Sequence, residues 1–196
     1  MDSEIVKYWQ DFYKKCDVTS IPSDFARFCS GFFKRGSTIA DVGCGNCRDT
    51  FYFASLGHKV IGIDAVDCVA GEIIPTDTVT LIKTDIEQLR PSSYDNIYAR
   101  FLLHAIPEET EDHLLKWAAD SLNGGYFCIE CRSVLDDSVQ TRRHYLRKID
   151  EQALTDKLES LGFTIILTCR GRGFSATPAE DPVLIRVICK KGRDNE

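Results

Sequence analysis

The sequence lacks three features that would each assign it to a particular class of protein. No apolar run is long enough to cross a bilayer, and the acidic start Met1-Asp2-Ser3-Glu4 differs from the basic start of a signal peptide. A basic surplus is also missing, because the net charge is -6, whereas general nucleic-acid binders are basic. We therefore expect a soluble cytoplasmic protein, a monomer or homodimer, that binds no membrane and is an unlikely partner for nucleic acid.

The nine cysteines do not form the pattern of a disulfide framework or a metal site. Their number is odd, and no export signal accompanies them. Cys128 and Cys131 lie in an expected strand, where residues three apart point to opposite faces and cannot readily chelate one ion. Cys44 and Cys47 lie in a glycine-containing turn. We predict reduced thiols and no bound metal.

Strand and helix patterns alternate along a chain of 196 residues, with no repeat or linker, which predicts one α/β domain (1–196) around a mostly parallel sheet. Helices are expected at Ser3–Lys15, Ser23–Lys34, Arg48–Leu56, Glu108–Leu122 and Glu151–Leu161. Strands are expected at Thr38–Val42, Lys59–Ile63, Val79–Lys83, Asn96–Phe101, Tyr126–Ser133, Phe163–Arg170 and Val183–Lys190. The last two follow one another without a helix, which indicates one antiparallel edge.

Acidic residues follow successive expected strands, where open α/β sheets bind their ligands. Asp41 ends the first strand and leads into Gly43-Cys44-Gly45, whose glycines let the backbone turn sharply and approach a ligand. Asp64 ends the second strand, at the place where an acid accepts both hydroxyls of a ribose. Asp85 follows the third. A lone acid here would be interpreted as a helix cap, whereas three at successive strand ends indicate a site.

The charge of this region distinguishes between two classes of cofactor. A dinucleotide would require a third glycine where this chain has Arg48, and acidic groups would repel its pyrophosphate. S-adenosylmethionine carries a sulfonium and an ammonium, which an acidic rim attracts. We therefore predict S-adenosylmethionine as cofactor, leaving S-adenosylhomocysteine as product, and no metal.

Five segments in order resemble the motifs of the class I S-adenosylmethionine-dependent methyltransferases. They are Asp41-Val42-Gly43-Cys44-Gly45-Asn46, Val60-Ile61-Gly62-Ile63-Asp64, Thr84-Asp85-Ile86, Tyr94-Asp95-Asn96-Ile97-Tyr98 with Ala99-Arg100-Phe101, and Leu122-Asn123-Gly124-Gly125-Tyr126. The run 43–49 is also similar to the small tellurite-resistance-type branch. The resemblance implies a Rossmann-like seven-stranded sheet with one antiparallel edge strand and helices on both faces. It also implies an N-terminal helical lid (1–35) and an acceptor-side insertion (134–150).

The same resemblance assigns residues to parts of the cofactor. Gly43 and Gly45 would face the methionine part and Asp41 its ammonium, while Asp64 would hold the ribose. Asp85 and the backbone of Ile86 would meet the adenine. Tyr13, in a Trp-x-x-x-Tyr segment, would reach the carboxylate, or else pack in an amphipathic helix. The other residues expected around the cofactor are Cys44, Asn46, Arg48, Ala65 and Arg100. The family usually has glycine at the position of Cys47.

Methyl transfer from a sulfonium is an in-line displacement that needs mainly alignment, and a base only if the acceptor is protonated. The candidate bases are His104, His144 and Glu130, although His104 also fits a packed or capping histidine, and Glu130 also fits an ion-pair partner of Arg132. Arginines at strand ends and in the insertion favour a small anionic acceptor. The candidates for binding it are Arg132, Arg143 and Tyr145, although a solvated basic stretch explains the same pattern.

Three functions remain open from the sequence. The first is a small-molecule methyltransferase. The second, a nucleic-acid (for example RNA) or protein methyltransferase, is disfavoured by the acidic balance and by the lack of an Asn/Asp-Pro-Pro-Tyr-like segment after the fourth strand. The third is a non-catalytic cofactor-binding scaffold or activator subunit, which Cys47 favours.

Overall fold

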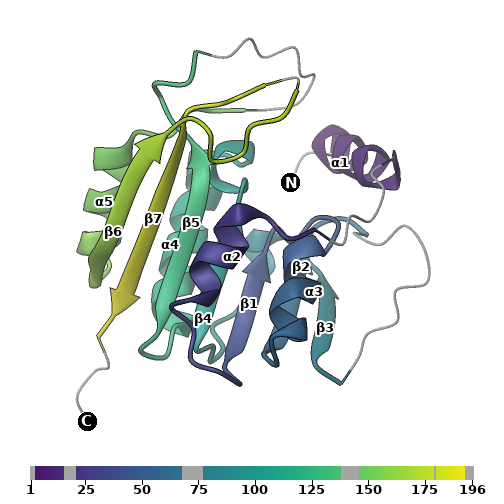
Figure 1. The fold of residues 1–196 in the computed structure, drawn as a ribbon, viewed down its shortest axis with the longest axis vertical. Helices are drawn as coiled ribbons and strands as arrows, with labels where there is room; N and C mark the ends of the chain where they lie inside the picture. Colours follow the sequence, from purple (N-terminus) through teal and green to yellow (C-terminus); the bar gives the residue numbers. More distant parts are fainter. Residues whose placement is uncertain (1–2, 16–20, 68–76, 138–145, 179, 193–196) are drawn as a thin grey trace.

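A seven-stranded sheet forms the centre of the computed structural model, which describes residues 3–15, 21–67, 77–137, 146–178 and 180–192 (Figure 1). Its order is β3-β2-β1-β4-β5-β7-β6. The strands are β1 Thr38–Val42, β2 Lys59–Asp64, β3 Val79–Lys83, β4 Asn96–Arg100, β5 Tyr126–Arg132, β6 Phe163–Gly171 and β7 Leu184–Lys191. All pairs are parallel except those of β7, which runs antiparallel between β5 and β6. The predicted fold class is confirmed, and an antiparallel pair forms one edge.

Helices cover both faces of this sheet. They are α1 Ser3–Lys15, α2 Asp24–Ser30, α3 Arg48–Ser55, α4 Glu108–Ser121 and α5 Glu151–Ser160, with short 3-10 helices η1 Ile86–Gln88 and η2 Leu103–Ala105. In Figure 1, α2 and α3 lie on one face and α4 and α5 on the other, while α1 lies beyond the end of the sheet where β1 and β2 stop. The observed helix α2 is shorter than the helix expected over Ser23–Lys34, since Ser23 is its N-cap and Gly31 its C-cap. Of the segment expected as a lid, α1 lies beyond the end of the sheet and α2 packs against the sheet.

Each strand contributes to two cores because its side chains alternate between the faces. Ile39 packs with Phe25 and Phe53 of α2 and α3, whereas Ala40 and Val42 belong to the larger core beneath α4 and α5. Alternation therefore directs Asp41 to the α3 side.

The second cysteine pair follows the same alternation. Cys128 lies in the smaller core and Cys131 in the larger one. The prediction that the two thiols point to opposite faces is confirmed.

No helix among the described residues is both long enough and apolar enough to span a membrane.

Candidate active site

The turn between β1 and α3 has a backbone that requires glycine at two positions. Gly43 and Gly45 have φ of 73° and 54°, values that side chains other than glycine rarely adopt. A Cβ on Gly43 would lie 2.9 Å from Cδ1 of Leu102, and a Cβ on Gly45 would lie 2.6 Å from the Tyr13 hydroxyl oxygen. We call residues 43–46 the glycine turn. Its backbone leaves no room for side chains on the residues that the sequence marked as glycines of a binding loop.

Cys47 follows the glycine turn and precedes the first residue of α3 in a left-handed conformation, with φ of 58°. This backbone favours glycine, because a Cβ there crowds the neighbouring carbonyl. The departure from the family pattern therefore places a strained residue at the start of α3.

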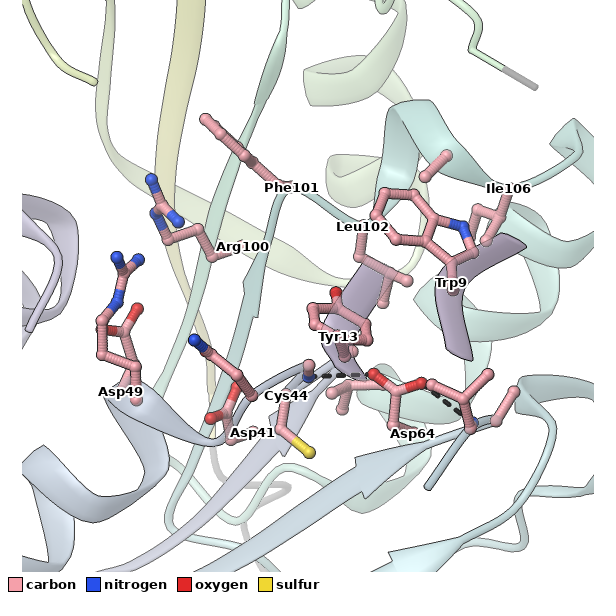
Figure 2. A pocket seen from close by; sticks show the side chains of 18 of the residues that line it. Trp9, Tyr13, Asp41, Cys44, Asp49, Asp64, Arg100, Phe101, Leu102 and Ile106 are labelled. Atoms are coloured by element: carbon pink, nitrogen blue, oxygen red, sulfur yellow. Dashed lines mark hydrogen bonds and ion pairs between the residues drawn. The ribbon is translucent and has the colours of Figure 1, made fainter. Parts of the chain in front are cut away.

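Asp41 and Asp64 form the acidic floor of the region beside the glycine turn (Figure 2). Asp41 is buried and accepts a hydrogen bond of 2.5 Å from the Thr50 hydroxyl. Asp64 accepts from the backbone N–H groups of Gly45, at 2.9 Å, and Val66, at 3.1 Å. Burial raises the pKa of Asp41 well above its usual value, and nearby carboxylates add to the rise. Burial also raises the pKa of Asp64, against these backbone hydrogen bonds. Both groups would ionise more readily beside a cation.

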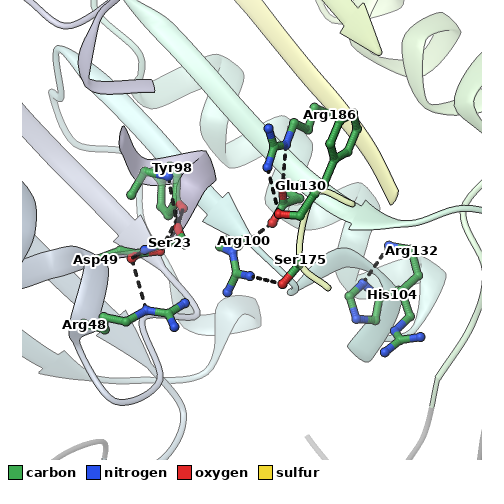
Figure 3. A network of polar contacts seen from close by, with 12 residues as sticks. Ser23, Arg48, Asp49, Tyr98, Arg100, His104, Glu130, Arg132, Ser175 and Arg186 are labelled. Atoms are coloured by element: carbon green, nitrogen blue, oxygen red, sulfur yellow. Dashed lines mark hydrogen bonds and ion pairs between the residues drawn. The ribbon is translucent and has the colours of Figure 1, made fainter. Parts of the chain in front are cut away.

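A third acid, Asp49, lies in the first turn of α3 and ties that helix to its neighbours (Figure 3). Its carboxylate accepts from the backbone and hydroxyl of Ser23, at 2.8 and 2.7 Å, from the Tyr98 hydroxyl, at 2.9 Å, and from Nε of Arg48, at 3.3 Å. The network fixes the N-terminus of α3 against α2 and β4. The sequence did not single out Asp49.

A cavity of about 630 Å³ opens above these acids. The predicted residues that line it are Tyr13, Asp41, Gly43, Cys44, Gly45, Asn46, Arg48, Asp64, Ala65, Ile86, Arg100 and His104. Figure 2 shows Asp41, Asp49 and Asp64 along one side and Arg100, Phe101, Leu102 and Ile106 along the other, with Trp9 and Tyr13 of α1 beside them. We call Asp41, Asp49 and Asp64 the acidic side.

Arg100 extends from the end of β4 and shares a buried carboxylate with a second arginine (Figure 3). Its Nε donates to Oε1 of Glu130 at 2.8 Å, and Nε of Arg186 donates to Oε2 at 2.7 Å. A second Arg100 nitrogen donates to Ser175 Oγ at 3.0 Å. Two guanidinium groups therefore share one carboxylate, and the charge of Asp49 also acts on Arg100. Glu130 is fully buried and raises the pKa of Arg100, against the effect of burial.

His104 lies on η2 and lines the cavity, and its Nδ1 takes part in a hydrogen bond with the backbone of β5 (Figure 3). The backbone N–H of Arg132 lies 3.1 Å from Nδ1, and an N–H can only donate, so Nδ1 accepts. In the neutral ring the proton is then on Nε2. A ring held in this tautomer is a hydrogen-bond donor at Nε2, and it can accept a proton only by losing the bond at Nδ1. We call Arg100, His104 and Ser175 the donor side.

Three predicted residues lie outside the cavity wall. Asp85 caps η1 by accepting from the N–H of Glu87, while its neighbours Thr84 and Ile86 line the cavity. Glu130 has both oxygens occupied by arginines, which opposes a role as base. Arg132 is buried between Asp136, at 2.9 Å, and Glu180, at 2.7 Å, so its charge is balanced within the protein rather than offered to an acceptor. Arg143, His144 and Tyr145 fall outside the described residues.

Part of the cavity wall was not predicted from the sequence. The connection between β6 and β7 contributes Ser175, Thr177, Glu180 and Pro182. Phe101, at the end of β4, has φ of 58°, and its ring lies 4.1 Å from the Arg100 guanidinium carbon. A bulky residue in a left-handed conformation is uncommon and concentrates at functional sites. No pattern in the sequence signals it. The prolines of the β6–β7 connection predict a turn, but they do not predict that this connection lines a cavity.

The sheet order and the cavity at the carboxyl ends of β1, β2 and β4 define the class I methyltransferase fold. Residues 39–125 match the family model described as methyltransferase domain, which confirms the resemblance inferred from the motifs. A search of curated proteins finds no match.

Solved structures of similar fold include three methyltransferases. The 1,6-didemethyltoxoflavin-N1-methyltransferase of Burkholderia thailandensis, with its acceptor and S-adenosylhomocysteine bound, has a TM-score of 0.72 at 17% identity, over 96% of this chain and 84% of that one. The magnesium protoporphyrin IX methyltransferase of Synechocystis, with S-adenosylhomocysteine bound, has 0.68 at 15%, over 96% and 86%. A TehB-like S-adenosylmethionine-dependent methyltransferase of Corynebacterium glutamicum has 0.66 at 17%, over 96% and 98%. At these identities the likeness shows a shared fold.

Proposed function

We propose that this protein binds S-adenosylmethionine and transfers its methyl group to a small anionic acceptor. The observation that carries the proposal is one cavity with an acidic side at the glycine turn and a donor side at the end of β4. The first suits a cationic cofactor and the second an anion, and both sides face the same space.

The residues of the acidic side fit the cofactor in chemistry and in shape. Asp64 ends β2, where its carboxylate would accept the ribose hydroxyls, and Asp41 would attract the ammonium group. Gly43 and Gly45 line the cavity, where the backbone of the turn would lie against the methionine part. Because burial raises the pKa of both carboxyl groups, a bound cation would offset the cost of their ionisation.

Bound S-adenosylmethionine supplies a methyl group that is already activated by its sulfonium. The protein then has to hold the acceptor in line and keep water out. Phe101, Leu102 and Ile106 would provide an apolar wall against water, while α1 would cover the opening with Trp9 and Tyr13.

The donor side would orient the acceptor. The guanidinium group of Arg100, which lines the cavity, would attract a carboxylate or phosphate, and Nε2 of His104 would donate to an oxygen. Glu130 is bound by both arginines, and His104 is held as a donor. Among the described residues, the former candidates for a base thus serve positioning, which favours an acceptor already nucleophilic at neutral pH.

Transfer of a labelled methyl group to a fractionated extract tests the proposal. We expect label in the low-molecular-mass fraction with wild type and at least tenfold less with Asp64→Ala, the matched variant on the acidic side, at a limiting cofactor concentration. Label in RNA or protein would instead support a macromolecular acceptor. Cofactor binding without transfer to any fraction would support the scaffold function.

A further inference from the structure

One thiol lies in the glycine turn and a second directly follows it. Their sulfur atoms are close but are not bonded. The Sγ atoms of Cys44 and Cys47 are 3.9 Å apart, and the backbone N–H of Cys47 donates to the Cys44 carbonyl at 2.9 Å, which closes the turn. Cys44 lines the cavity, whereas Cys47 is fully buried behind it. One thiol is therefore accessible from the cavity and the other is placed to react with it.

Four other cysteines in the described part of the chain are buried, whereas Cys44 is half-buried. Cys29 and Cys128 are both fully buried in the smaller core, where burial raises the pKa of Cys29 well above its usual value and their mutual contact adds to the rise. Burial likewise raises the pKa of Cys131 and Cys189 in the larger core. A peroxide reaches fully buried thiols slowly, so these four cysteines provide an internal comparison.

We propose that Cys44 and Cys47 form a redox-responsive modification site that controls the glycine turn, with a peroxide as oxidant. The Cys44 sulfur attacks one peroxide oxygen, forming a sulfenic acid and releasing water from hydrogen peroxide. The Cys47 sulfur then attacks the sulfenic sulfur, forms the disulfide and releases a second water. Two thiols lose two electrons and two protons in total, and the peroxide is reduced to two waters.

Closing this bond would move the backbone that holds Asp64. A disulfide has an S–S length of about 2.05 Å, so the two sulfurs must approach by nearly half of their present separation. Gly45 lies between them, donates its N–H to Asp64 at 2.9 Å and packs against Tyr13. The neighbouring N–H groups of Gly43 and Cys44 both donate to the Ile63 carbonyl, at 2.8 and 3.2 Å. Oxidation would thus displace the residues assigned to the ribose and methionine parts.

The strained backbone of Cys47 is the second observation that supports this site. The left-handed conformation costs free energy in a residue with a Cβ, and glycine adopts it without that cost. If this position served only cofactor binding, glycine would therefore be the more favourable residue. The cysteine adds a reactive group at the cost of that strain.

The effect on binding rests on the proposed function, whereas disulfide formation does not, so the test measures them separately. The reduced full-length protein is treated with hydrogen peroxide, alkylated after denaturation and digested with trypsin. Residues 36–48 form one tryptic peptide that holds both thiols. We expect this peptide to lose two hydrogens and resist alkylation, while peptides with Cys29 and Cys128 are alkylated. An unoxidised 36–48 peptide, or Cys44 paired with another cysteine, would overturn the proposal.

Calorimetry with S-adenosylmethionine follows on the same samples. We expect affinity to fall at least tenfold on oxidation and to return with dithiothreitol, while Cys44→Ser, which lacks the thiol that the peroxide attacks, gives the same affinity with and without peroxide. Equal affinity of oxidised and reduced wild type would overturn the control of binding. If reduced wild type gave no heat, the proposed function would fail, while the peptide mass would still decide whether the dithiol site exists.

Discussion

The two sides of the cavity are built in different ways. The acidic side comes from residues close in sequence, where β1 and β2 stop and α3 begins. The donor side is assembled from β4, η2 and the β6–β7 connection, and is held by a carboxylate of β5 that lies outside the cavity wall. A local site leaves a motif in the sequence, while a site assembled from distant segments does not. The comparison also separates the expected roles: the acidic side binds the cofactor, and the donor side orients the acceptor.

The largest expected effect is a loss of stability on substitution of Glu130, which holds the donor side in place. Glu130→Gln removes the charge shared by Arg100 and Arg186 and leaves two buried guanidinium groups facing one another. We expect the free energy of unfolding to fall by about 3 kcal/mol, as when a buried ion pair loses one partner. Denaturant unfolding measures it.

Glu108→Gln is the matched control, because Glu108 pairs with Lys157 on the surface, and we expect little change in stability. If Glu130→Gln kept wild-type stability and lost only activity, Glu130 would act as a base, and the anchoring role would be wrong.

The acidic side predicts a pH dependence of cofactor binding. Because the pKa values of Asp41 and Asp64 are raised, protonation begins above the ordinary range of carboxyl groups, and each neutralised acid attracts the cation less. Affinity for S-adenosylmethionine should fall with decreasing pH, by up to about tenfold per unit for each proton taken up. Calorimetry across the pH range measures it. Adenosine, which has neither cation, should show a smaller slope; equal slopes would contradict the electrostatic role.

His104 tests the donor side through two amide substitutions. Asn places an acceptor near Nδ1 and loses the donor at Nε2, whereas Gln reaches the position of Nε2. We expect His104→Asn to fold normally and to raise the acceptor KM about tenfold, the loss of one hydrogen bond to a charged group. Steady-state kinetics measure it.

Retained activity in His104→Gln at neutral pH would support the donor role. A pH–rate profile whose acidic limb disappears in both variants would instead identify His104 as a base.

The smallest effect is a gain in stability from Asp41→Asn. A carboxyl group whose pKa is raised by folding stabilises the protein at low pH, and that contribution is lost as the pH rises through the folded pKa. The charged form of Asp41 is therefore a cost to the folded state, while Asn carries no charge and keeps an oxygen for Thr50. We expect the free energy of unfolding to rise by about 1 kcal/mol, with weaker cofactor binding. A lower Tm would show that the ionised carboxylate stabilises the fold.

Most of the fold was predictable because each element carries a local signal. Thr38–Val42 and Val79–Lys83 match the expected bounds, since short apolar strands are enclosed by turn residues. The 3-10 helices η1 and η2 were not predicted, because three residues are too few for a periodic pattern.

The acidic side of the site was more predictable than the donor side. Asp41, Asp64 and the glycines are recognisable because the turn needs special backbone geometry and the acids follow strand ends. Asp85 fits the same pattern, yet it caps η1. Glu130 and Arg132 point from strand β5 and suggest chemistry, but their partners come from distant segments that no spacing reveals. Ser175 and Phe101 also line the cavity, and no local pattern in the sequence predicts that position.

The central claim is that the acidic side holds S-adenosylmethionine, and calorimetry with wild type and Asp64→Ala tests it most directly. We expect wild type to bind with a micromolar Kd, a binding free energy of about −8 kcal/mol, and Asp64→Ala to bind at least tenfold more weakly. The absence of binding heat with reduced wild type would contradict the claim, as would equal affinity of the two proteins.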